Sequence, residues 1–340
     1  MWHQRRKTKT AESVLLHFEV PFFATTQISA APGLAMANHP TAYNDILNKC
    51  TSLSCTRRFI KGYSSPQVSF YRLSFTGLSC LELYTVSLKY TRPYVKEIIK
   101  QMLDEGFYIY FNRVDDFYLP GKSWYGIRHF SHDGVICGYD ESDHTYSIAA
   151  YDINWVYKLI KISQESFFEG LDSMFEQKSY SELCAYKAKD EEVKLDEKMI
   201  LKHLKEYLFF DKEKFDVKEN GKVYGIAVHD FLAMYIEKLK DGKIPHEKMD
   251  WRSLRPIWEH KRCMLDRIIA IEKLKNWDDT FSIAYRPLVE YADRIRMMYA
   301  MYHKTARASI LTGIERGLLE LKEREREILT KFVEKMEEQQ

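Results

Sequence analysis

The spacing of apolar residues changes near residue 190, and this change constrains the fold more than any other feature of the sequence. Before it, short runs rich in aromatic and β-branched residues alternate with turn residues, as in β-strands. After it, apolar residues recur every three to four positions over long stretches, as in amphipathic helices. We therefore expect an α+β domain over residues 1–185, a charged linker over residues 187–197, and an all-helical domain over residues 190–340.

Composition narrows the class of protein. The 340-residue chain has 51 basic and 49 acidic residues, and so small a net charge argues against a nucleic-acid partner. Its six cysteines are scattered with no CxxC pair, which suggests neither a zinc site nor a disulfide framework and fits a reducing cytoplasm. No stretch approaches the ~20 apolar residues that cross a bilayer. No nucleotide or metal-ligand motif occurs. We expect a cytoplasmic protein that uses no metal, cofactor or membrane.

Local patterns place several elements before residue 190. Residues 13–23 predict a short strand, residues 28–37 a loop of small residues, and the segment from Pro40 a short helix. Residues 92–105 predict an amphipathic helix that ends at Gly106, a typical C-cap residue. Aromatic and β-branched residues then predict a strand.

The segments HDGVICGYD and TYSIAAYD predict two strands joined by a turn, that is, a hairpin. His132 opens the first strand and Asp152 closes the second. Because the start of one antiparallel strand lies beside the end of the next, we expect these two side chains to meet. A carboxylate beside an imidazole fixes the tautomer of the ring and supports acid–base catalysis. Spacing alone leaves a second interpretation open, in which His132 is a polar strand-end residue and Asp152 a turn former.

The run EGFYIYFNRVDDFYLPGKSWYGIRHFSHDGVICGYDESDHTYSIAAYD resembles the papain-like cysteine protease homologues of antibiotic biosynthesis. It is similar to the amino-terminal domain of butirosin-type acyltransferases and to the closthioamide-type amide synthases. The likeness rests on EGFYIYF, DDFYLPG, HFSHDGVICGYD and the closing YD. The later segments YGIAVHDFLAMYI and LRPIWEHKRCMLDRI are similar to the helical tail of that family. The resemblance implies a papain-like antiparallel sheet with packed helices, a helical domain that walls the cleft, and catalytic roles for His132 and Asp152.

The papain-like class also implies a nucleophilic cysteine at the start of a helix, where the helix field and a neighbouring imidazolium lower the pKa of the thiol. The apolar pair that follows such a helix start matches Ile46 and Leu47, and counting back nine residues from Ile46 gives Ala37. The segment around it, GLAMANHP, has no cysteine. Three explanations stay open: a native cysteine has been replaced, the site is naturally inactive, or the register is wrong. In the last case Cys50 and Cys55 are next in line.

The resemblance implies thiol-dependent acyl transfer that forms an amide. An acyl group, delivered as a phosphopantetheine thioester on an acyl or peptidyl carrier protein, would pass to the cysteine at position 37. A small-molecule amine would then attack it in place of water. His132 would serve as general base and acid, and Asp152 would orient the ring. A thioester already carries the activation, so no further cofactor is expected.

Two alternatives need the same residues. A cysteine peptidase or thioesterase would use the same triad with water as the acceptor. A catalytically inactive binding homologue would keep the groove and lose the thiol, and the alanine at position 37 favours it.

Overall fold

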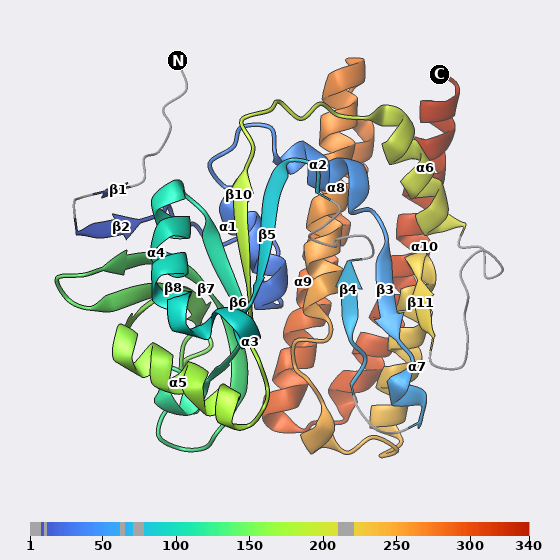
Figure 1. Ribbon diagram of the computed structural model, residues 1–340. Helices are drawn as coiled ribbons and strands as arrows, with labels where there is room; N and C mark the ends of the chain where they lie inside the picture. Colours follow the sequence, from blue (N-terminus) through green and yellow to red (C-terminus); the bar gives the residue numbers. More distant parts are fainter. Residues whose placement is uncertain (1–7, 10–11, 62–64, 71–77, 210–220, 340) are drawn as a thin grey trace. The chain divides into compact units, whose positions relative to one another are not determined.

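The chain is α+β, as expected, and divides into two compact units. The computed structural model (Figure 1) describes residues 8–9, 12–61, 65–70, 78–209 and 221–339. The sheet unit is formed by residues 1–43 and 78–193, and the helical unit by residues 44–77 and 194–340. The second crossing, at 193–194, falls in the expected linker. The first crossing was not expected, because residues 44–77 belong to the helical unit rather than to the amino-terminal domain.

The sheet unit is built on one antiparallel sheet of eight strands. Six of them follow the order β1-β2-β7-β6-β10-β5, while β8 and β9 continue from β7. The strands are β1 (Thr8–Lys9), β2 (Ser13–Leu15), β5 (Leu81–Ser87), β6 (Tyr108–Asp115), β7 (Ser131–Asp140), β8 (Thr145–Tyr151), β9 (Tyr157–Ser163) and β10 (Glu182–Ala188). The expected strand over residues 13–23 is therefore much shorter. The expected hairpin is confirmed as β7 and β8, which pair antiparallel.

Strand β7 is the centre of this sheet because three strands pair with it. Its outer half pairs with β2 at Gly138, where a Cβ atom would lie 2.4 Å from the carbonyl oxygen of Val14. Only glycine allows so close an approach of the two backbones. Its opening half pairs with β6, and its other edge pairs with β8. The opening residues of β7 are thus held by the end of β6.

Three helices cover the sheet, and three short helical segments accompany them. Helix α1 (Gln27–Met36) packs on β5, β6, β7 and β10, while α5 (Gln164–Glu176) packs on β6 and β9. In Figure 1, α4 and α5 lie in front of the strands and α1 behind them. The predicted amphipathic helix is confirmed as α4 (Val95–Glu105), which ends at Gly106 in the left-handed conformation with φ of 94°. The short segments are α3 (Leu88–Thr91), η3 (Arg92–Tyr94) and η4 (Asp116–Tyr118).

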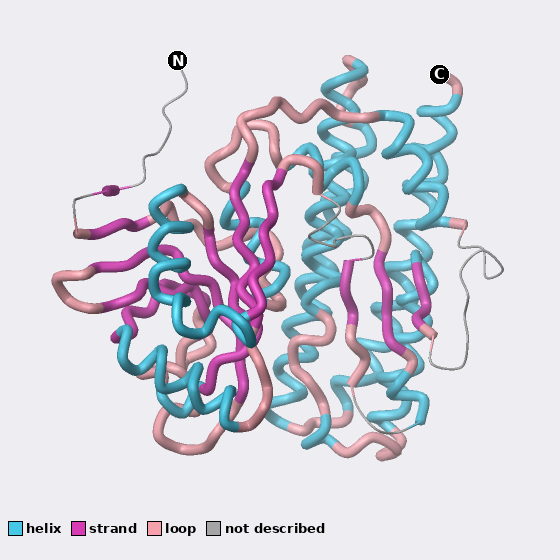
Figure 2. Tube along the Cα trace, in the orientation of Figure 1, coloured by secondary structure: helices cyan, strands magenta, loops and turns pink. Residues whose placement is uncertain are grey.

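The helical unit also contains a small three-stranded sheet, which lies beside its helices (Figure 2). Its strands are β3 (Leu53–Thr56), β4 (Val68–Phe70) and β11 (Lys222–Tyr224), and β3 lies between the other two. Its helices are α2 (Tyr43–Lys49), α6 (Glu197–Leu208), α7 (Val228–Lys240), α8 (Arg255–Lys275), α9 (Thr280–Thr305) and α10 (Ser309–Glu337), with single turns η1 (Arg58–Lys61), η5 (Gly225–Ala227) and η6 (His246–Lys248). Leu53, Cys55 and Phe59 are fully buried in the same core as α7 and α8, which explains why residues 44–77 join this unit.

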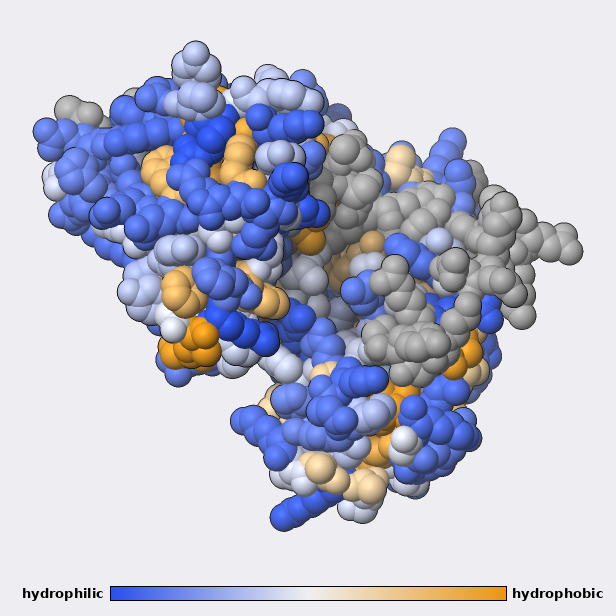
Figure 3. Space-filling view, turned by 60° about the horizontal axis from the view of Figure 1, so that its bottom comes forward, coloured by the Kyte–Doolittle hydropathy of each residue, from blue (hydrophilic) through white to orange (hydrophobic). Residues whose placement is uncertain are grey.

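The described helices include none that is long and apolar enough to cross a bilayer. On the face seen in Figure 3, hydrophilic residues cover most of the visible surface and hydrophobic residues form separate patches.

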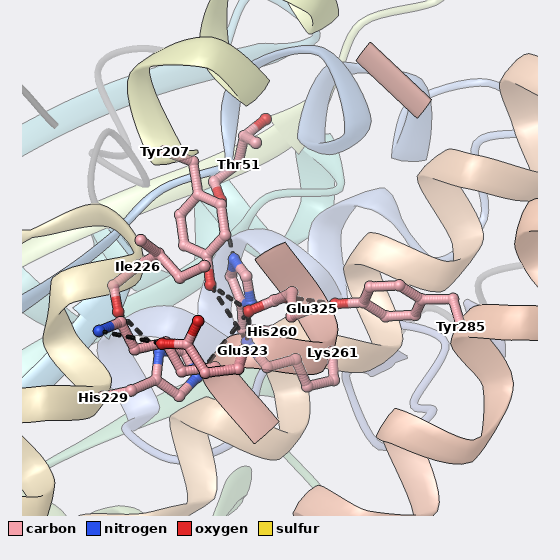
Figure 4. A network of polar contacts seen from close by, with 10 residues as sticks. Thr51, Tyr207, Ile226, His229, His260, Lys261, Tyr285, Glu323 and Glu325 are labelled. Atoms are coloured by element: carbon pink, nitrogen blue, oxygen red, sulfur yellow. Dashed lines mark hydrogen bonds and ion pairs between the residues drawn. The ribbon is translucent and has the colours of Figure 1, made fainter. Parts of the chain in front are cut away.

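A polar network centred on the fully buried Glu325 lies inside the helical unit (Figure 4). The carboxylate of Glu325 accepts hydrogen bonds from the Lys261 ammonium at 2.6 Å, from the Tyr207 hydroxyl at 2.6 Å and from the Tyr285 hydroxyl. Lys261 also lies 3.3 Å from Nδ1 of His260. Burial alone would raise the pKa of Glu325, but the positive charge of Lys261 and its hydrogen bond outweigh burial and hold this pKa at about 2. Burial lowers the pKa of Lys261 and the charge of Glu325 opposes this effect, so each partner stabilises the charge of the other.

We expect Lys261→Met to lower the free energy of unfolding by about 3–5 kcal/mol, because it leaves the buried carboxylate of Glu325 without a counter-charge. The double variant Lys261→Met, Glu325→Leu removes both charges and is expected to recover most of that loss. Urea denaturation of both variants measures the difference. A double variant that is less stable than Lys261→Met would show that the charge pair itself, rather than its compensation, stabilises the core.

Acid should destabilise the helical unit through its buried histidines. Burial lowers the pKa of His229 to about 3, and the neighbouring positive charge of Lys261 adds to this effect. Because the unfolded chain takes up this proton near pH ~6.5 and the folded chain does not, stability is complete above that pH and falls as pH drops toward 3. Burial lowers the pKa of His260 in the same direction.

We expect His229→Phe to reduce the slope of unfolding free energy against pH by about 1.4 kcal/mol per pH unit in the window between these two pKa values. Chemical denaturation at a series of pH values measures the slope. The exposed residue His144 provides the control, since His144→Asn should leave the slope unchanged. Equal slopes for His229→Phe and the parent protein would mean that His229 is protonated in the folded state.

Candidate functional site

Two consecutive carboxylates stand where β6 ends. Asp115 is the last residue of β6 and Asp116 opens η4, the turn that follows. The chain then loops out and returns as β7, where Ser131 pairs with Asp115 and His132 pairs with Val114. The backbone N–H of Asp116 donates to the carbonyl of Phe130 at 2.9 Å, which fixes both ends of the loop. Both carboxylates are almost completely buried.

His132 is held by Asp116. Its Nδ1 lies 2.9 Å from Oδ2 of Asp116, and its Nε2 lies 3.7 Å from Oδ1 of Asp133. Because an ionised carboxylate only accepts hydrogen bonds, Nδ1 carries the proton and donates it to Asp116. The His132 side chain is 26% exposed while that of Asp116 is 2% exposed. A buried carboxylate therefore orients the imidazole at Nδ1, while Nε2 has the longer contact with Asp133, and this arrangement suits a general base.

A buried lysine stands behind this pair. Lys122 is 3% exposed, and its Nζ lies 3.7 Å from the second oxygen of Asp116. Burial lowers the pKa of Lys122, although the carboxylates of Asp116 and Asp133 oppose this effect. Burial also raises the pKa of Asp133, whose Oδ2 accepts a hydrogen bond from the Tyr110 hydroxyl at 3.1 Å. Ionisable groups displaced from their ordinary pKa by burial and by one another are typical of functional sites.

Asp115 holds a second imidazole. Its Oδ2 lies 2.6 Å from Nδ1 of His129 and accepts the Ser173 hydroxyl at 2.7 Å. The two Asp–His pairs use different carboxylates, since Asp115 holds His129 and Asp116 holds His132. The candidate site thus comprises Asp115, Asp116, Lys122, His129 and Asp133 besides His132. The carboxylates of the DDFYLPG motif had no predicted role, although two aspartates directly after a buried strand could have indicated them.

Asp152 does not bond to His132, so the expected pairing is wrong in this structure. Its Oδ1 accepts the backbone N–H groups of Asn154 at 2.8 Å and Val156 at 2.9 Å, and its Oδ2 lies 2.6 Å from Nζ of Lys158. The hydrogen bonds from Lys158, Val156 and Asn154 lower the pKa of Asp152. The paired part of the β7–β8 hairpin stops at Val135 and Ala149, and the chain turns at Asp152. Asp152 is the turn former of the second interpretation.

Ala37 does not open a helix. It is the C-cap of α1, with φ of −55° and ψ of −26°, and its N–H points to the carbonyl of Leu34. The expected loop over residues 28–37 is in fact helical, since the burial of its small side chains outweighs the unfavourable Pro32 and Gly33. At this end of a helix the dipole is negative and would raise the pKa of a thiol. Ala37 is therefore unsuited to the nucleophile position assigned to it.

The cysteines next in line are no better placed. Cys50 and Cys55 are buried in the helical unit, and burial raises the pKa of Cys50 and raises that of Cys55 to about 12. Five of the six cysteines are buried, and Cys184 is half-buried. The polar contacts of His132 with described residues are those with Asp116 and Asp133, so no thiol touches its ring.

The helix start that lies near the hairpin is that of α1. The hydroxyl of Tyr151, at the end of β8, donates to the carbonyl of Ala24, just before Gln27 opens the helix. Gln27 is 3% exposed, and neither polar atom of its side-chain amide has a hydrogen-bond partner among the residues that the structure describes. Nothing in the structure explains this buried amide.

The described residues contain no group of three or more histidine, cysteine, aspartate or glutamate side chains placed to hold a metal ion. No protein-family model matches the chain. No curated protein matches it either. The resemblance to papain-like homologues therefore stays a prediction from the motifs alone.

We expect Asp116→Asn to release the tautomer of His132, because a carboxamide can donate to Nδ1 as well as accept from it. Nitrogen-15 NMR of the imidazole should show Nδ1 protonated in the parent protein and a mixture in the variant. Asp152→Ala is the matched comparison. It should leave the ring unchanged and lower the free energy of unfolding by about 1–3 kcal/mol, because two turn N–H groups lose their acceptor. A changed tautomer in Asp152→Ala alone would restore the original pairing.

Proposed function

We propose that this protein catalyses acyl transfer with His132 as the general base and Asp116 as the carboxylate that orients it. One observation carries the proposal: a partly exposed imidazole whose Nδ1 is held at 2.9 Å by a buried carboxylate and whose Nε2 lies 3.7 Å from Asp133. A neutral imidazole fixed in this tautomer is suited to take a proton from an attacking amine or water. Asp116 thus has the role that the motif resemblance gave to Asp152.

The proposed reaction joins an amine to an acyl thioester. The amine nitrogen attacks the thioester carbonyl and forms the C–N bond, Nε2 of His132 accepts the amine proton, and the C–S bond breaks to release a thiolate. Transfer of that proton to the thiolate returns the imidazole to its starting form. Asp133, whose pKa is raised by burial, lies 3.7 Å from Nε2 and is placed to share this proton. Atoms and charges balance as thioester plus amine giving amide plus thiol.

The motif resemblance supplies the identity of the reactants. It favours a phosphopantetheine thioester on an acyl or peptidyl carrier protein as donor, a small-molecule amine as acceptor, and a place in cytoplasmic antibiotic biosynthesis of the nonribosomal peptide kind. Balanced charge argues against nucleic acid as a partner. A peptidase or thioesterase would use the same base with water as the acceptor.

A second candidate function is binding without catalysis. The observation that favours it is the state of the cysteines, since none contacts His132 and five of the six are buried. A homologue that had lost its thiol would retain the Asp116–His132 pair only as part of a ligand site.

We expect His132→Ala to slow thioester consumption by about 10²–10⁴-fold, because it removes the general base. The assay follows thiol release from an acyl N-acetylcysteamine thioester with and without butylamine, and mass spectrometry identifies the amide. Asp116→Asn should also be slow. The matched control is Asp143→Asn, an exposed aspartate of the β7–β8 turn paired with Lys161.

The outcomes separate the functions. Amide formation that depends on both His132 and Asp116 supports the acyltransferase. Thiol release that is indifferent to amine, with free acid as product, indicates a thioesterase. Parent protein no faster than buffer, together with unchanged thioester binding in the His132→Ala variant, would leave the binding function.

A further inference from the structure

The proposed reaction passes the acyl chain directly from the thioester to the amine, and no thiol contacts His132 to carry that chain in between. The second Asp–His pair, on β6 and the loop before β7, is not used by the proposed reaction. It differs from the first pair in two respects. Its imidazole is more exposed, and its outer nitrogen has no polar contact with a described residue.

Asp115 is fully buried and accepts four hydrogen bonds. Its Oδ2 receives His129 Nδ1 at 2.6 Å and the Ser173 hydroxyl at 2.7 Å, and its Oδ1 receives the backbone N–H groups of Phe130 at 2.9 Å and Phe117 at 3.1 Å. These hydrogen bonds outweigh burial and lower the pKa of Asp115. The carboxylate therefore stays ionised, and Nδ1 of His129 must carry the proton that it donates.

The ring of His129 is fixed but open. It stacks on Phe117 with 4.5 Å between ring centroids and 26° between planes. Its side chain is 57% exposed. Nε2 makes no polar contact with any residue that the structure describes. A neutral imidazole with Nδ1 protonated has its free electron pair on Nε2, so the nucleophilic nitrogen faces solvent.

The loop that carries His129 is braced on both sides. The N–H of Gly126 donates to the carbonyl of Phe117 at 3.0 Å. The guanidinium of Arg128 lies 3.5 Å from the ring centroid of Trp124. Beside His129, Ile127 and Phe130 are exposed apolar side chains. An acyl chain that approaches Nε2 of His129 would therefore meet apolar surface.

We propose that Nε2 of His129 is the acyl acceptor of this protein, in place of a cysteine, for apolar acyl groups carried as thioesters. The inference rests on the proposed transfer of an acyl group from a thioester to an amine, and it replaces direct attack by the amine with two steps through an acyl-imidazole. Histidine forms covalent intermediates of this kind in other enzymes, and an adjacent group that holds Nδ1 activates it.

The step balances without a further reactant. The Nε2 electron pair attacks the thioester carbonyl, the N–C bond forms, the C–S bond breaks, and the thiolate leaves with the electron pair of that bond. In the acyl-imidazolium, the proton stays on Nδ1 and is hydrogen-bonded to Asp115. The negative charge of Asp115 stabilises the new positive charge of the ring. An amine then attacks the acyl carbon, the C–N bond to the ring breaks, and its electron pair returns to Nε2. The proton lost by the amine ends on the thiolate.

Labelling of individual histidines tests the proposal without knowledge of the natural substrate. The full-length protein is treated with diethylpyrocarbonate at about pH 8, where an ordinary imidazole is neutral, and peptide mapping gives a rate for each histidine. We expect His129 to react at least about tenfold faster than the exposed His144, because its nucleophilic nitrogen is fixed outward. A rate for His129 equal to or below that of His144 would overturn the proposal.

Turnover of a model acyl thioester gives the second measurement. His129→Gln should abolish the burst of thiol release, whereas His39→Gln, at a half-buried histidine outside the site, should keep it. Ser173→Ala, which removes one of the four donors to Asp115, should reduce the burst less than His129→Gln. A full burst in His129→Gln shows that another group accepts the acyl chain.

The two proposals fail differently. If His129→Gln retains turnover and His132→Ala loses it, the acyl-imidazole is excluded and the general base stands. If His132→Ala retains turnover while His129 is still labelled by the thioester, the proposed base is wrong and the acyl acceptor stands.

Discussion

Burial of two neighbouring carboxylates at the end of β6 is the constraint on which the rest of the sheet unit's site depends. A buried carboxylate costs several kcal/mol unless donors surround it. Asp115 obtains four, two of them backbone N–H groups of the loop that follows, and Asp116 obtains an imidazole and a nearby ammonium. The loop must therefore fold back over the strand end, and the two imidazoles are fixed as donors by the same requirement. The orientation of both imidazoles thus follows from the need of the two buried carboxylates for hydrogen-bond donors.

The helical unit meets the same problem in a different way. Glu325 is surrounded by donors from three helices, and every member of its network is inaccessible to solvent. No group there can reach a reactant, so the network specifies how the helices pack. The contrast shows why exposure of one end of the network, as at His129 and His132, separates a candidate site from a structural one.

Features set by local pattern could be predicted from the sequence, and features set by competition between partners could not. The α4 stripe, its end at Gly106 and the β7–β8 hairpin each depend on residues within one segment. The carboxylate of Asp152 could accept from turn N–H groups or from the imidazole of His132. It accepts from the turn N–H groups because the strand ends just before it. The prediction that Ala37 opens a helix was wrong for a similar reason, because burial kept residues 27–36 helical despite Pro32 and Gly33. The roles of Asp115 and Asp116 could have been predicted from the sequence, because two aspartates directly after a buried strand need hydrogen-bond donors nearby.

The helical unit is made of two segments that are synthesised at different times, because the chain leaves the ribosome from its amino terminus. Residues 44–77 are synthesised early, yet β3 pairs with β11, where Cys55 lies opposite Val223. The rest of the sheet unit, residues 78–193, is made in the interval, so this unit has every residue that it needs while the β3–β4 hairpin still lacks a third strand. Long-range pairing of this kind is slow, and an unpaired strand edge is prone to association with other chains. Nascent chains stalled between residues 193 and 222 would therefore present a finished unit and an open strand edge together.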